Sequence, residues 1–329
     1  MVKVAAYFVT DAERPYFEKV KKELPLEFTV FTSDNLTMEN VHDIPDGTEA
    51  VSIMPAAQTT REILEILKAK GIKTVGTRSA GLDSIDLVAA KELDIKITNV
   101  PAYSPQAIAE FTVMLILMGL RDPKLMLKKE LNGDFSDLPR ISHQLDTRIV
   151  GILGYGYIGQ AVAKLLQPFG CKIIVYVEPQ FRNPETLLSG MEYSETITDF
   201  FKQSNVITLH CPSTPDTYHL VNAERIALMT DGIIINTARG PIVDAKAVLD
   251  ALDSDELNYY ATDVYEYEQG IFHRTFETLD EIQDELFKRL LRHPKTFVTP
   301  HVAFNTFTSV KNMVNFGMEN AIKAIKELE

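Results

Sequence analysis

The chain has 329 residues, 45% hydrophobic and 24% charged, an ordinary composition for a globular protein long enough for two domains. Its net charge of −13 argues against nucleic acid as a partner, because phosphate binding depends on basic patches. The two cysteines, Cys171 and Cys211, fit no disulfide or metal-binding spacing. We therefore expect reduced thiols, no metal site and a cytoplasmic protein.

The N-terminal residues 1–8 read as an opening strand and show no signal-peptide cleavage pattern. The most apolar stretch, residues 111–120, is too short to cross a bilayer. We expect it to form a buried helix, and we expect no contact with a membrane.

Strand-like and helix-like segments alternate through the first hundred residues. Apolar, strand-like runs lie at 2–9, 28–31, 50–54, 73–77 and 96–99. Helical spacing of apolar residues predicts helices at 14–23, 61–70 and 86–93. This alternation predicts a parallel sheet with right-handed helical crossovers.

A second series of strands follows a long predicted helix at 104–120. Its strands are predicted at 148–153, 172–177, 205–210, 232–236, 259–264 and 296–299. Their nearly continuous apolar runs are typical of strands covered on both faces. Helices are predicted at 160–169, 280–291 and 308–328. The pattern indicates two similar lobes, with the C-terminal helix folding back on the first lobe.

Three glycines, Gly154, Gly156 and Gly159, separate a predicted strand from a predicted helix, and the next strand ends near Glu178. Strand, glycine turn, helix and strand in this order are typical of a dinucleotide-binding site. Gly154 would allow the sharp turn, Gly156 the close approach of a pyrophosphate, and Gly159 the packing of helix on strand. The start of the helix would bind the phosphates with free N–H groups and its positive dipole.

Polar side chains follow the last strands of the second series. Arg239, Glu268 and His301 each come after one of the last three strands, and Cys211-Pro212 follows the strand before them. The carboxyl ends of strands in an open α/β sheet meet at the ligand crevice. An arginine, a carboxylate and a histidine beside a nicotinamide are what oxidation of a 2-hydroxy acid requires.

Each of these three residues has a role in such a site. Arg239 can hold a substrate carboxylate with two parallel hydrogen bonds. His301 can exchange a proton with the substrate oxygen, and Glu268 would favour its charged form and fix its tautomer. The cofactor carries the hydride. Taken singly, Arg239 also fits a surface ion pair, Glu268 a solvated charge and His301 a capping residue. Their positions at successive strand ends favour catalysis.

Together these motifs resemble the D-2-hydroxyacid dehydrogenases, most of all the D-lactate dehydrogenase branch. The resemblance rests on residues 99–110, 154–159, 236–244, 263–268 and 299–301. It extends over nearly the whole chain. It implies that Arg239 orients the substrate, His301 is the acid/base and Glu268 is its partner.

The resemblance also implies the binding residues. The cofactor NAD(H) would contact Gly154, Gly156, Tyr157, Ile158, Gly159, Val177, Glu178, Cys211, Pro212, Thr217, Thr237, Ala238, Arg239 and Asp263. The substrate would contact Arg78, Ala80, Gly81, Tyr103, Phe304 and Met54. Among these, the backbone N–H groups of Ala80 and Gly81 would bind the carboxylate, and the last three side chains would line the pocket.

The implied fold class is α/β, with two Rossmann-like lobes built on parallel sheets and the nucleotide lobe inserted in the catalytic lobe. Residues 104–299 would form the NAD-binding domain, and residues 1–103 with 300–329 the catalytic domain. His301 would lie at the return crossover, where closure of the lobes would position it over the nicotinamide. Homodimers would form through the NAD-binding domain.

One position departs from the family pattern. An aspartate is expected where Val177 stands, and this chain has Glu178 one residue later. Side chains alternate along a strand, so a shift of one residue would direct the carboxylate elsewhere. Either the strand ends before 178 and Glu178 reaches the ribose, or the site accepts the 2′-phosphate of NADP with Arg182 as its partner. We favour NAD.

The expected function is reduction of a small 2-keto acid, pyruvate above others, to the D-2-hydroxy acid with NADH. A bulkier substrate such as 2-ketoisocaproate or phenylpyruvate is an alternative. A formate dehydrogenase of the same superfamily is disfavoured, because Glu268 would have no expected counterpart there. A protein that senses NAD(H) without turnover is a further alternative, since a fold alone does not establish catalysis.

Overall fold

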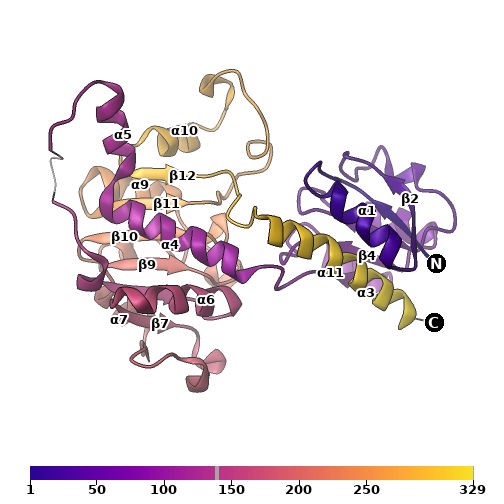
Figure 1. Ribbon diagram of the computed structural model, residues 1–329, viewed down its shortest axis with the longest axis horizontal. Coiled ribbons are helices and arrows are strands. Elements are labelled where there is room, and N and C mark those ends of the chain that lie inside the picture. The colour runs from indigo at the N-terminus through magenta and orange to yellow at the C-terminus, as the bar shows by residue number, and fades with distance from the viewer. Residues whose placement is uncertain (138–140, 329) are drawn as a thin grey trace. The chain divides into compact units, whose positions relative to one another are not determined.

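The computed structural model describes residues 1–137 and 141–328, which form two compact units (Figure 1). Unit 1 comprises Met1–Ser104 and Asn305–Glu329, and unit 2 comprises Pro105–Phe304. Each unit contains a sheet of parallel strands flanked by helices, which confirms the predicted α/β class. The chain leaves unit 2 after Phe304 rather than after residue 299, because residues 302 and 303 hydrogen-bond to Asp263 of unit 2.

Unit 1 contains a five-stranded sheet in the order β2-β1-β3-β4-β5. Its strands are β1 (Val2–Ala6), β2 (Leu26–Phe31), β3 (Ala50–Ile53), β4 (Thr74–Thr77) and β5 (Lys96–Thr98). All of the strand pairs are parallel. The chain therefore has to cross over between strands, and helices form most of these connections.

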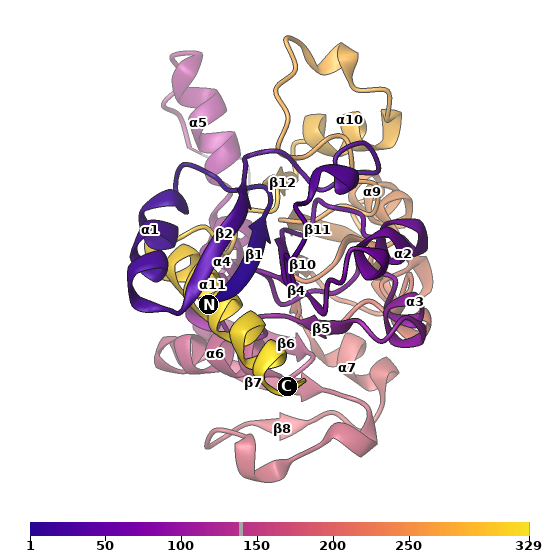
Figure 2. The same ribbon diagram turned by 90° about the vertical axis from the view of Figure 1, so that its right-hand side faces the viewer.

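Helices cover both faces of this sheet. They are α1 (Arg14–Glu23), α2 (Arg61–Ala69), α3 (Leu87–Glu92) and α11 (Phe307–Lys326). Val4 packs with Phe17 of α1 and Met318 of α11, whereas Ala5 packs with Leu64 of α2. Neighbouring residues of one strand thus enter different cores, as the alternation of side chains along a strand requires. Figure 2 shows α1 and α11 on one side and α2 and α3 on the other.

Unit 2 contains a seven-stranded parallel sheet in the order β12-β11-β10-β9-β6-β7-β8. Its strands are β6 (Ile149–Leu153), β7 (Lys172–Tyr176), β8 (Glu192–Tyr193), β9 (Val206–Leu209), β10 (Gly232–Asn236), β11 (Leu257–Thr262) and β12 (Thr296–Val298). The strand order reverses direction next to β6, so β6 and its neighbour β9 flank the point where such sheets bind ligands.

The helices of unit 2 also form two layers. They are α4 (Pro105–Arg121), α5 (Pro123–Leu131), α6 (Tyr157–Leu166), α7 (Ile197–Gln203), α8 (Ala223–Ile226), α9 (Ala245–Asp253) and α10 (Glu285–Arg292). Helices α4 and α6 lie next to each other (Figure 1) and contribute to one core, whereas the other core contains residues of α7, α8, α9 and α10. In the described part of the chain, no helix is both long enough and apolar enough to span a bilayer.

Several helices differ from the predicted ones in their bounds. The helix predicted from residue 160 begins at Tyr157, inside the glycine motif. The helix predicted over 280–291 begins at Glu285, because the Asp284 side chain accepts the N–H of Phe287 at 2.9 Å and caps it. The remaining unit 2 helices, α5, α7, α8 and α9, were not predicted as individual elements.

Candidate active site

The glycine turn joins the end of β6 to the start of α6. Gly154 has φ +93°, and a Cβ there would lie 2.6 Å from the Cys211 nitrogen. A Cβ on Gly159 would lie 2.3 Å from the Gly154 carbonyl oxygen. A Cβ on Gly156, in contrast, would meet nothing within 4 Å. Gly154 and Gly159 are thus required by the fold, whereas the absent side chain of Gly156 leaves open space above the turn.

That open space fits a dinucleotide. The α6 helix begins at Tyr157, so its first N–H groups, including those of Tyr157 and Ile158, have no partners within the helix and form the positive end of its dipole. The Tyr157 side chain is exposed, so only its backbone contributes to the turn. A pyrophosphate in front of Gly156 would meet these groups at close range.

The end of β7 bears on the question raised by Val177. The strand ends at Tyr176, and the Gly154 N–H donates to the Tyr176 carbonyl at 2.9 Å, so the strand end lies beside the glycine turn. Glu178 lies beyond the strand and accepts a hydrogen bond from the Tyr176 hydroxyl at 3.0 Å. Because the strand ends before Glu178, strict alternation of side chains does not govern the direction of this carboxylate.

Arg182 already has several partners. Its guanidinium donates to the Ser194 carbonyl at 2.8 Å and to the Glu195 carbonyl at 2.9 Å, and it contacts the Glu195 carboxylate at 3.2 Å. It also lies over the Tyr193 ring. This arrangement disfavours the alternative in which Arg182 binds a 2′-phosphate.

The segment after β9 forms a wall beside the glycine turn. Cys211 is partly buried, and burial raises the pKa of its thiol to about 12. The Thr217 hydroxyl donates to the Pro212 carbonyl at 2.8 Å and shapes this loop. His210 was not predicted as a site residue; burial lowers its pKa to about 3, so the ring is neutral. Its Nε2 lies 2.9 Å from the Thr208 hydroxyl.

The segment after β10 carries Arg239. The side chain of buried Asn236 fixes the backbone of this segment. It accepts the Ala238 N–H at 3.0 Å and donates to the Arg239 carbonyl at 2.9 Å. The Thr237 hydroxyl lies 2.9 Å from that of Thr112 on α4, which ties the segment to the helix layer. Asn236 was not predicted as a site residue, although an asparagine at the end of an otherwise apolar strand is a usable signal.

His301 and Glu268 form a direct pair. His301 Nδ1 lies 2.8 Å from Glu268 Oε1, and the Tyr265 N–H donates to Glu268 Oε2 at 2.9 Å. Burial tends to raise the pKa of Glu268, but the His301 hydrogen bond and charge outweigh it, so the net pKa is lowered. The charge of Arg239 acts in the same direction. The three residues predicted to be catalytic are therefore close enough to interact at one end of the unit 2 sheet.

Asp263 organises the segment that contains His301. It is 1% exposed, and its carboxylate accepts the N–H groups of Val302 and Ala303, each at 2.8 Å. The Thr299 hydroxyl donates to the same carboxylate at 2.6 Å. Burial raises the pKa of Asp263 despite these hydrogen bonds. A role of Asp263 in binding the cofactor stays a prediction.

In unit 1, the predicted carboxylate-binding loop follows β4. Val100 N–H donates to the Ser79 carbonyl at 2.8 Å, and the Asn99 side chain donates to the Ala80 carbonyl at 2.7 Å. The Ser79 hydroxyl donates to the Gly81 carbonyl at 3.0 Å. With these carbonyls bound on one side, the N–H groups of Ala80 and Gly81 are the groups that could bind an anion, as predicted, but the role itself stays a prediction.

The prediction that Arg78 contacts the substrate needs a correction, because the Arg78 side chain is bound within unit 1 and offers no group to a substrate. It is fully buried in unit 1, where Nε donates to Glu13 at 2.8 Å and Nη1 to Ser52 at 3.0 Å. Nη2 donates to the carbonyls of Tyr7 and Phe8. The guanidinium thus anchors the chain just before the Ser79–Gly81 loop, a placement that the motif alone did not reveal.

The three predicted pocket residues lie in different units. Met54 follows β3 and Tyr103 precedes α4, both half-buried in unit 1, and the Tyr103 carbonyl accepts a hydrogen bond from Asn312 at 2.7 Å. Phe304 is the last residue of unit 2 and is also half-buried. Their contribution to one substrate pocket stays a prediction.

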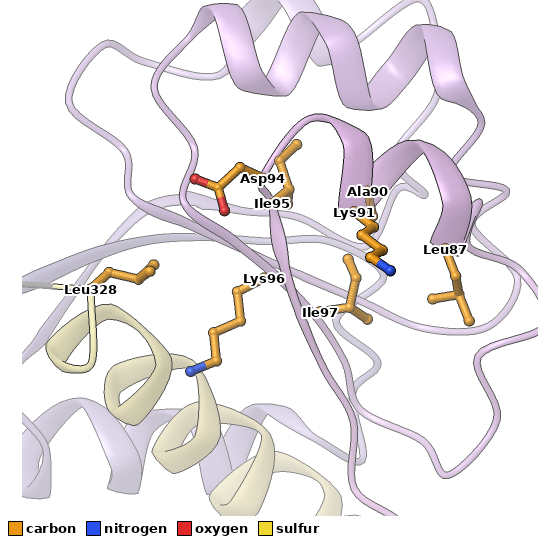
Figure 3. A pocket seen from close by; sticks show the side chains of 8 residues that line it. All are labelled: Leu87, Ala90, Lys91, Asp94, Ile95, Lys96, Ile97 and Leu328. Atoms are coloured by element: carbon orange, nitrogen blue, oxygen red, sulfur yellow. The ribbon is translucent and has the colours of Figure 1, made fainter.

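A hollow of about 390 Å³ lies elsewhere in unit 1, between α3, β5 and the end of α11 (Figure 3). Its lining residues are Leu87, Ala90, Lys91, Asp94, Ile95, Lys96, Ile97 and Leu328. It contains none of the predicted site residues. This hollow is therefore a poor guide to the chemistry of this chain.

Comparison with known proteins identifies the family. The family model described as "D-isomer specific 2-hydroxyacid dehydrogenase, NAD binding domain" matches residues 113–303. A D-lactate dehydrogenase of Lactiplantibacillus plantarum is 38% identical over 320 residues, which cover 97% of this chain and 95% of that protein. The family model lies within unit 2, and the match to the relative spans both units.

Solved structures agree with the sequence comparison. The NAD-complexed D-isomer specific 2-hydroxyacid dehydrogenase of Lactobacillus delbrueckii ssp. bulgaricus superposes with a TM-score of 0.84 at 31% identity, covering 99% of this chain and 98% of that one. A D-2-hydroxyisocaproate dehydrogenase gives 0.86 at 32% identity, covering 100% and 98%. The glycine turn and the strand-end groups therefore belong to an NAD-dependent oxidoreductase, and the chain is a member of the D-isomer specific 2-hydroxyacid dehydrogenase family.

Proposed function

We propose that this protein reduces pyruvate to D-lactate with NADH, using His301 as the acid/base. The observation that carries the proposal is the His301–Glu268 pair, with a separation of 2.8 Å, beside the charge of Arg239. The similarity to a D-lactate dehydrogenase over nearly the whole chain supports pyruvate as the substrate.

Each residue has one role in the proposed reaction. When bound, NADH supplies the hydride that reduces the carbonyl carbon. Arg239 binds the substrate carboxylate and orients the carbonyl. His301 Nε2 gives a proton to the carbonyl oxygen as the alcohol forms, and in the reverse reaction it accepts that proton. Glu268 stabilises the charged imidazole that is needed for reduction.

The direct test is the disappearance of NADH absorbance with pyruvate, followed by chiral analysis of the product. We expect D-lactate, and we expect His301→Gln to lose most of kcat, roughly a hundredfold or more. Arg239→Lys should mainly raise the pyruvate KM, by about tenfold or more, because a lysine makes no two-pronged contact with a carboxylate. Formation of L-lactate, or an unchanged His301→Gln enzyme, would refute the proposal.

A bulkier 2-keto acid is a second candidate substrate. The similarity to a D-2-hydroxyisocaproate dehydrogenase favours it, as does Met54, whose unbranched side chain can adapt to different neighbours. A panel of pyruvate, 2-ketoisocaproate, phenylpyruvate and oxaloacetate, each with NADH and NADPH, ranks the substrates and cofactors by kcat/KM. One methylene changes discrimination by about 1–3 kcal/mol, so a clear preference would be measurable.

We also infer a homodimer that forms through unit 2. No residue of α5 is buried, and Leu131 on α5 and Phe135 after it are 78% and 82% exposed. An apolar surface of this kind is typical of a protein interface. Light scattering after size exclusion should show a dimer, and Leu131→Asp with Phe135→Asp should yield monomers. Phe181→Asp, at an exposed aromatic elsewhere in unit 2, is the control and should remain dimeric.

We further propose a cytoplasmic location. Cys171 and Cys211 are both free, which is compatible with a reducing compartment. Fractionation of the source cells, with the protein detected by antibody, tests this; recovery in an exported fraction would contradict it.

A further inference from the structure

A second histidine–glutamate pair lies in unit 2. His219 Nε2 lies 3.0 Å from Glu266 Oε2, and the Tyr218 hydroxyl donates to Glu266 Oε1 at 2.9 Å. The rings of Tyr218 and His219 stack with their centroids 4.0 Å apart. The Glu266 side chain is only 11% exposed, so both of its oxygens have partners in a largely buried position.

Backbone contacts connect this pair to the segment after β10. The His219 N–H donates to the Pro241 carbonyl at 2.8 Å. A Cβ on Gly240 would lie 2.1 Å from the Tyr265 carbonyl carbon and 2.3 Å from the Glu266 nitrogen. The Gly240 backbone is thus in direct contact with the Tyr265–Glu266 peptide, at a separation that no larger residue permits.

Tyr265 is also connected to the catalytic pair, and its carbonyl accepts the Glu268 N–H at 3.3 Å. The Tyr265 N–H donates to Glu268 Oε2 at 2.9 Å, and Glu268 Oε1 contacts His301. The Tyr265 backbone therefore lies between Gly240, which follows Arg239 directly, and Glu268: its carbonyl side contacts Gly240 and its N–H holds the Glu268 carboxylate. A movement of Tyr265 would displace both Gly240 and Glu268.

The backbone of His219 shows that the arrangement is imposed by its surroundings. Its φ is +45°, in the left-handed region that non-glycine residues rarely adopt. The Glu266 contact and the Pro241 hydrogen bond hold it there. Such strain is retained where neighbouring interactions over-determine the conformation.

We propose that Tyr218, His219 and Glu266 form a positioning cluster that fixes the Arg239 segment relative to the Glu268–His301 pair. The cluster acts through the backbone of Gly240 and Tyr265, not by contact with substrate. This inference rests on the proposed function, because the spacing matters only if Arg239 and His301 act on one substrate. A misplacement of about 1 Å can cost about a hundredfold in rate.

The experiment compares four variants of the full-length protein with wild type. Glu266→Ala removes both acceptors, Glu266→Gln keeps one oxygen, Tyr218→Phe removes one donor, and His219→Gln removes the imidazole. The matched control is Glu256→Gln, an exposed acid just before the other end of β11. Steady-state kinetics with pyruvate are combined with NADH affinity measured by fluorescence and with thermal melting.

Positioning predicts a specific split among these readouts. Glu266→Ala should lower kcat and raise the pyruvate KM, with kcat/KM falling roughly 10- to 100-fold, while NADH affinity stays within about twofold. Glu266→Gln should recover part of the loss, Tyr218→Phe should cost only a few-fold, and Glu256→Gln should match wild type.

Two outcomes would overturn the inference. The first is wild-type kcat and KM in folded Glu266→Ala, with or without a shift in its melting temperature. The second applies if Glu266→Ala does not fold: wild-type kinetics in Glu266→Gln, Tyr218→Phe and His219→Gln together. An inactive wild-type protein with every 2-keto acid would instead overturn the proposed function, so the two failures are distinguishable.

Discussion

His301 Nδ1 and Glu268 Oε1 lie 2.8 Å apart, and this contact determines which nitrogen of the ring can react. A carboxylate only accepts hydrogen bonds, so Nδ1 carries a proton and Nε2 is left for exchange with a substrate. The His301 backbone has φ +57°, and the hydrogen bonds from the next two residues to Asp263 hold it there. The ring is therefore oriented through its side chain and through its backbone.

The first prediction concerns the pH dependence of a Glu268→Gln variant. Reduction needs a charged imidazole, and the glutamine no longer supplies the negative partner that favours it. We expect kcat for pyruvate reduction to fall by roughly 10- to 100-fold, and its decline with rising pH to begin at lower pH than in wild type. Oxidation of D-lactate, which needs the neutral ring, should begin at correspondingly lower pH.

Profiles of kcat/KM against pH in both directions check this prediction, with Glu256→Gln as the control for loss of an acid. If the two profiles of Glu268→Gln coincide with those of wild type, Glu268 is not the partner of the acid/base.

The second prediction concerns stability in acid. The pKa of Glu268 is lowered in the folded protein, so this carboxylate stabilises the fold above its unfolded-state pKa. The contribution is lost as the pH falls below the ordinary value of 4.5 and through the lowered one. Urea unfolding from pH 7 to 3 should show wild type losing more stability than Glu268→Gln. If the stabilities of wild type and Glu268→Gln change in parallel with pH, the pKa of Glu268 is the same in the folded and the unfolded protein.

The third prediction separates the three glycines of the turn. An alanine at Gly154 or Gly159 would contact backbone atoms at 2.6 Å or 2.3 Å, so we expect loss of folding stability of several kcal/mol, above the usual ~1 kcal/mol for glycine in a left-handed position. Gly156→Ala meets no protein atom within 4 Å and should fold normally. It should nevertheless weaken NADH binding, because its methyl group would occupy the space of the pyrophosphate.

Thermal melting and NADH titration of the three alanine variants together check this contrast. Gly190→Ala is a suitable control, since it has a left-handed φ of +83° and open space around it. Wild-type NADH affinity in Gly156→Ala would show that the dinucleotide does not cross the turn there.

Most of the strand positions follow from patterns within single segments. The apolar runs that became β6 and β10 are bounded by a polar residue before and a glycine or asparagine at or after the end, so their limits were predictable. α9 was missed, although Asp244 accepts the Ala247 N–H at 3.0 Å as a typical cap. Such a signal is visible in a sequence, but it is weak without knowing that a strand precedes it.

The site was predictable where the chemistry follows a strand end and unpredictable where it depends on distant partners. Arg239, Glu268 and His301 share an end of one sheet, which the strand order makes necessary. The burial of Arg78 depends on Glu13, far away in the sequence, and could not be read from the motif around it. The same holds for the Glu266 contact with His219.

The last prediction concerns Asp263, whose carboxylate is 1% exposed and binds three donors. In Asp263→Asn the remaining oxygen can serve Thr299 and Val302, but the amide NH₂ then faces the N–H of Ala303. An unpaired buried donor costs about 1–3 kcal/mol, so we expect a lower Tm. We also expect a lower kcat, because the His301 segment loses its anchor.

Thr299→Val is the matched variant for this prediction, since it removes the hydroxyl donor and leaves both backbone contacts of the carboxylate in place. It should lose stability but retain kcat within a few-fold. Melting curves and pyruvate kinetics of the two variants distinguish anchoring from general stabilisation. If Asp263→Asn and Thr299→Val lose kcat equally, the backbone of residues 302 and 303 does not orient His301, and Asp263 would matter to the enzyme only through the stability of unit 2.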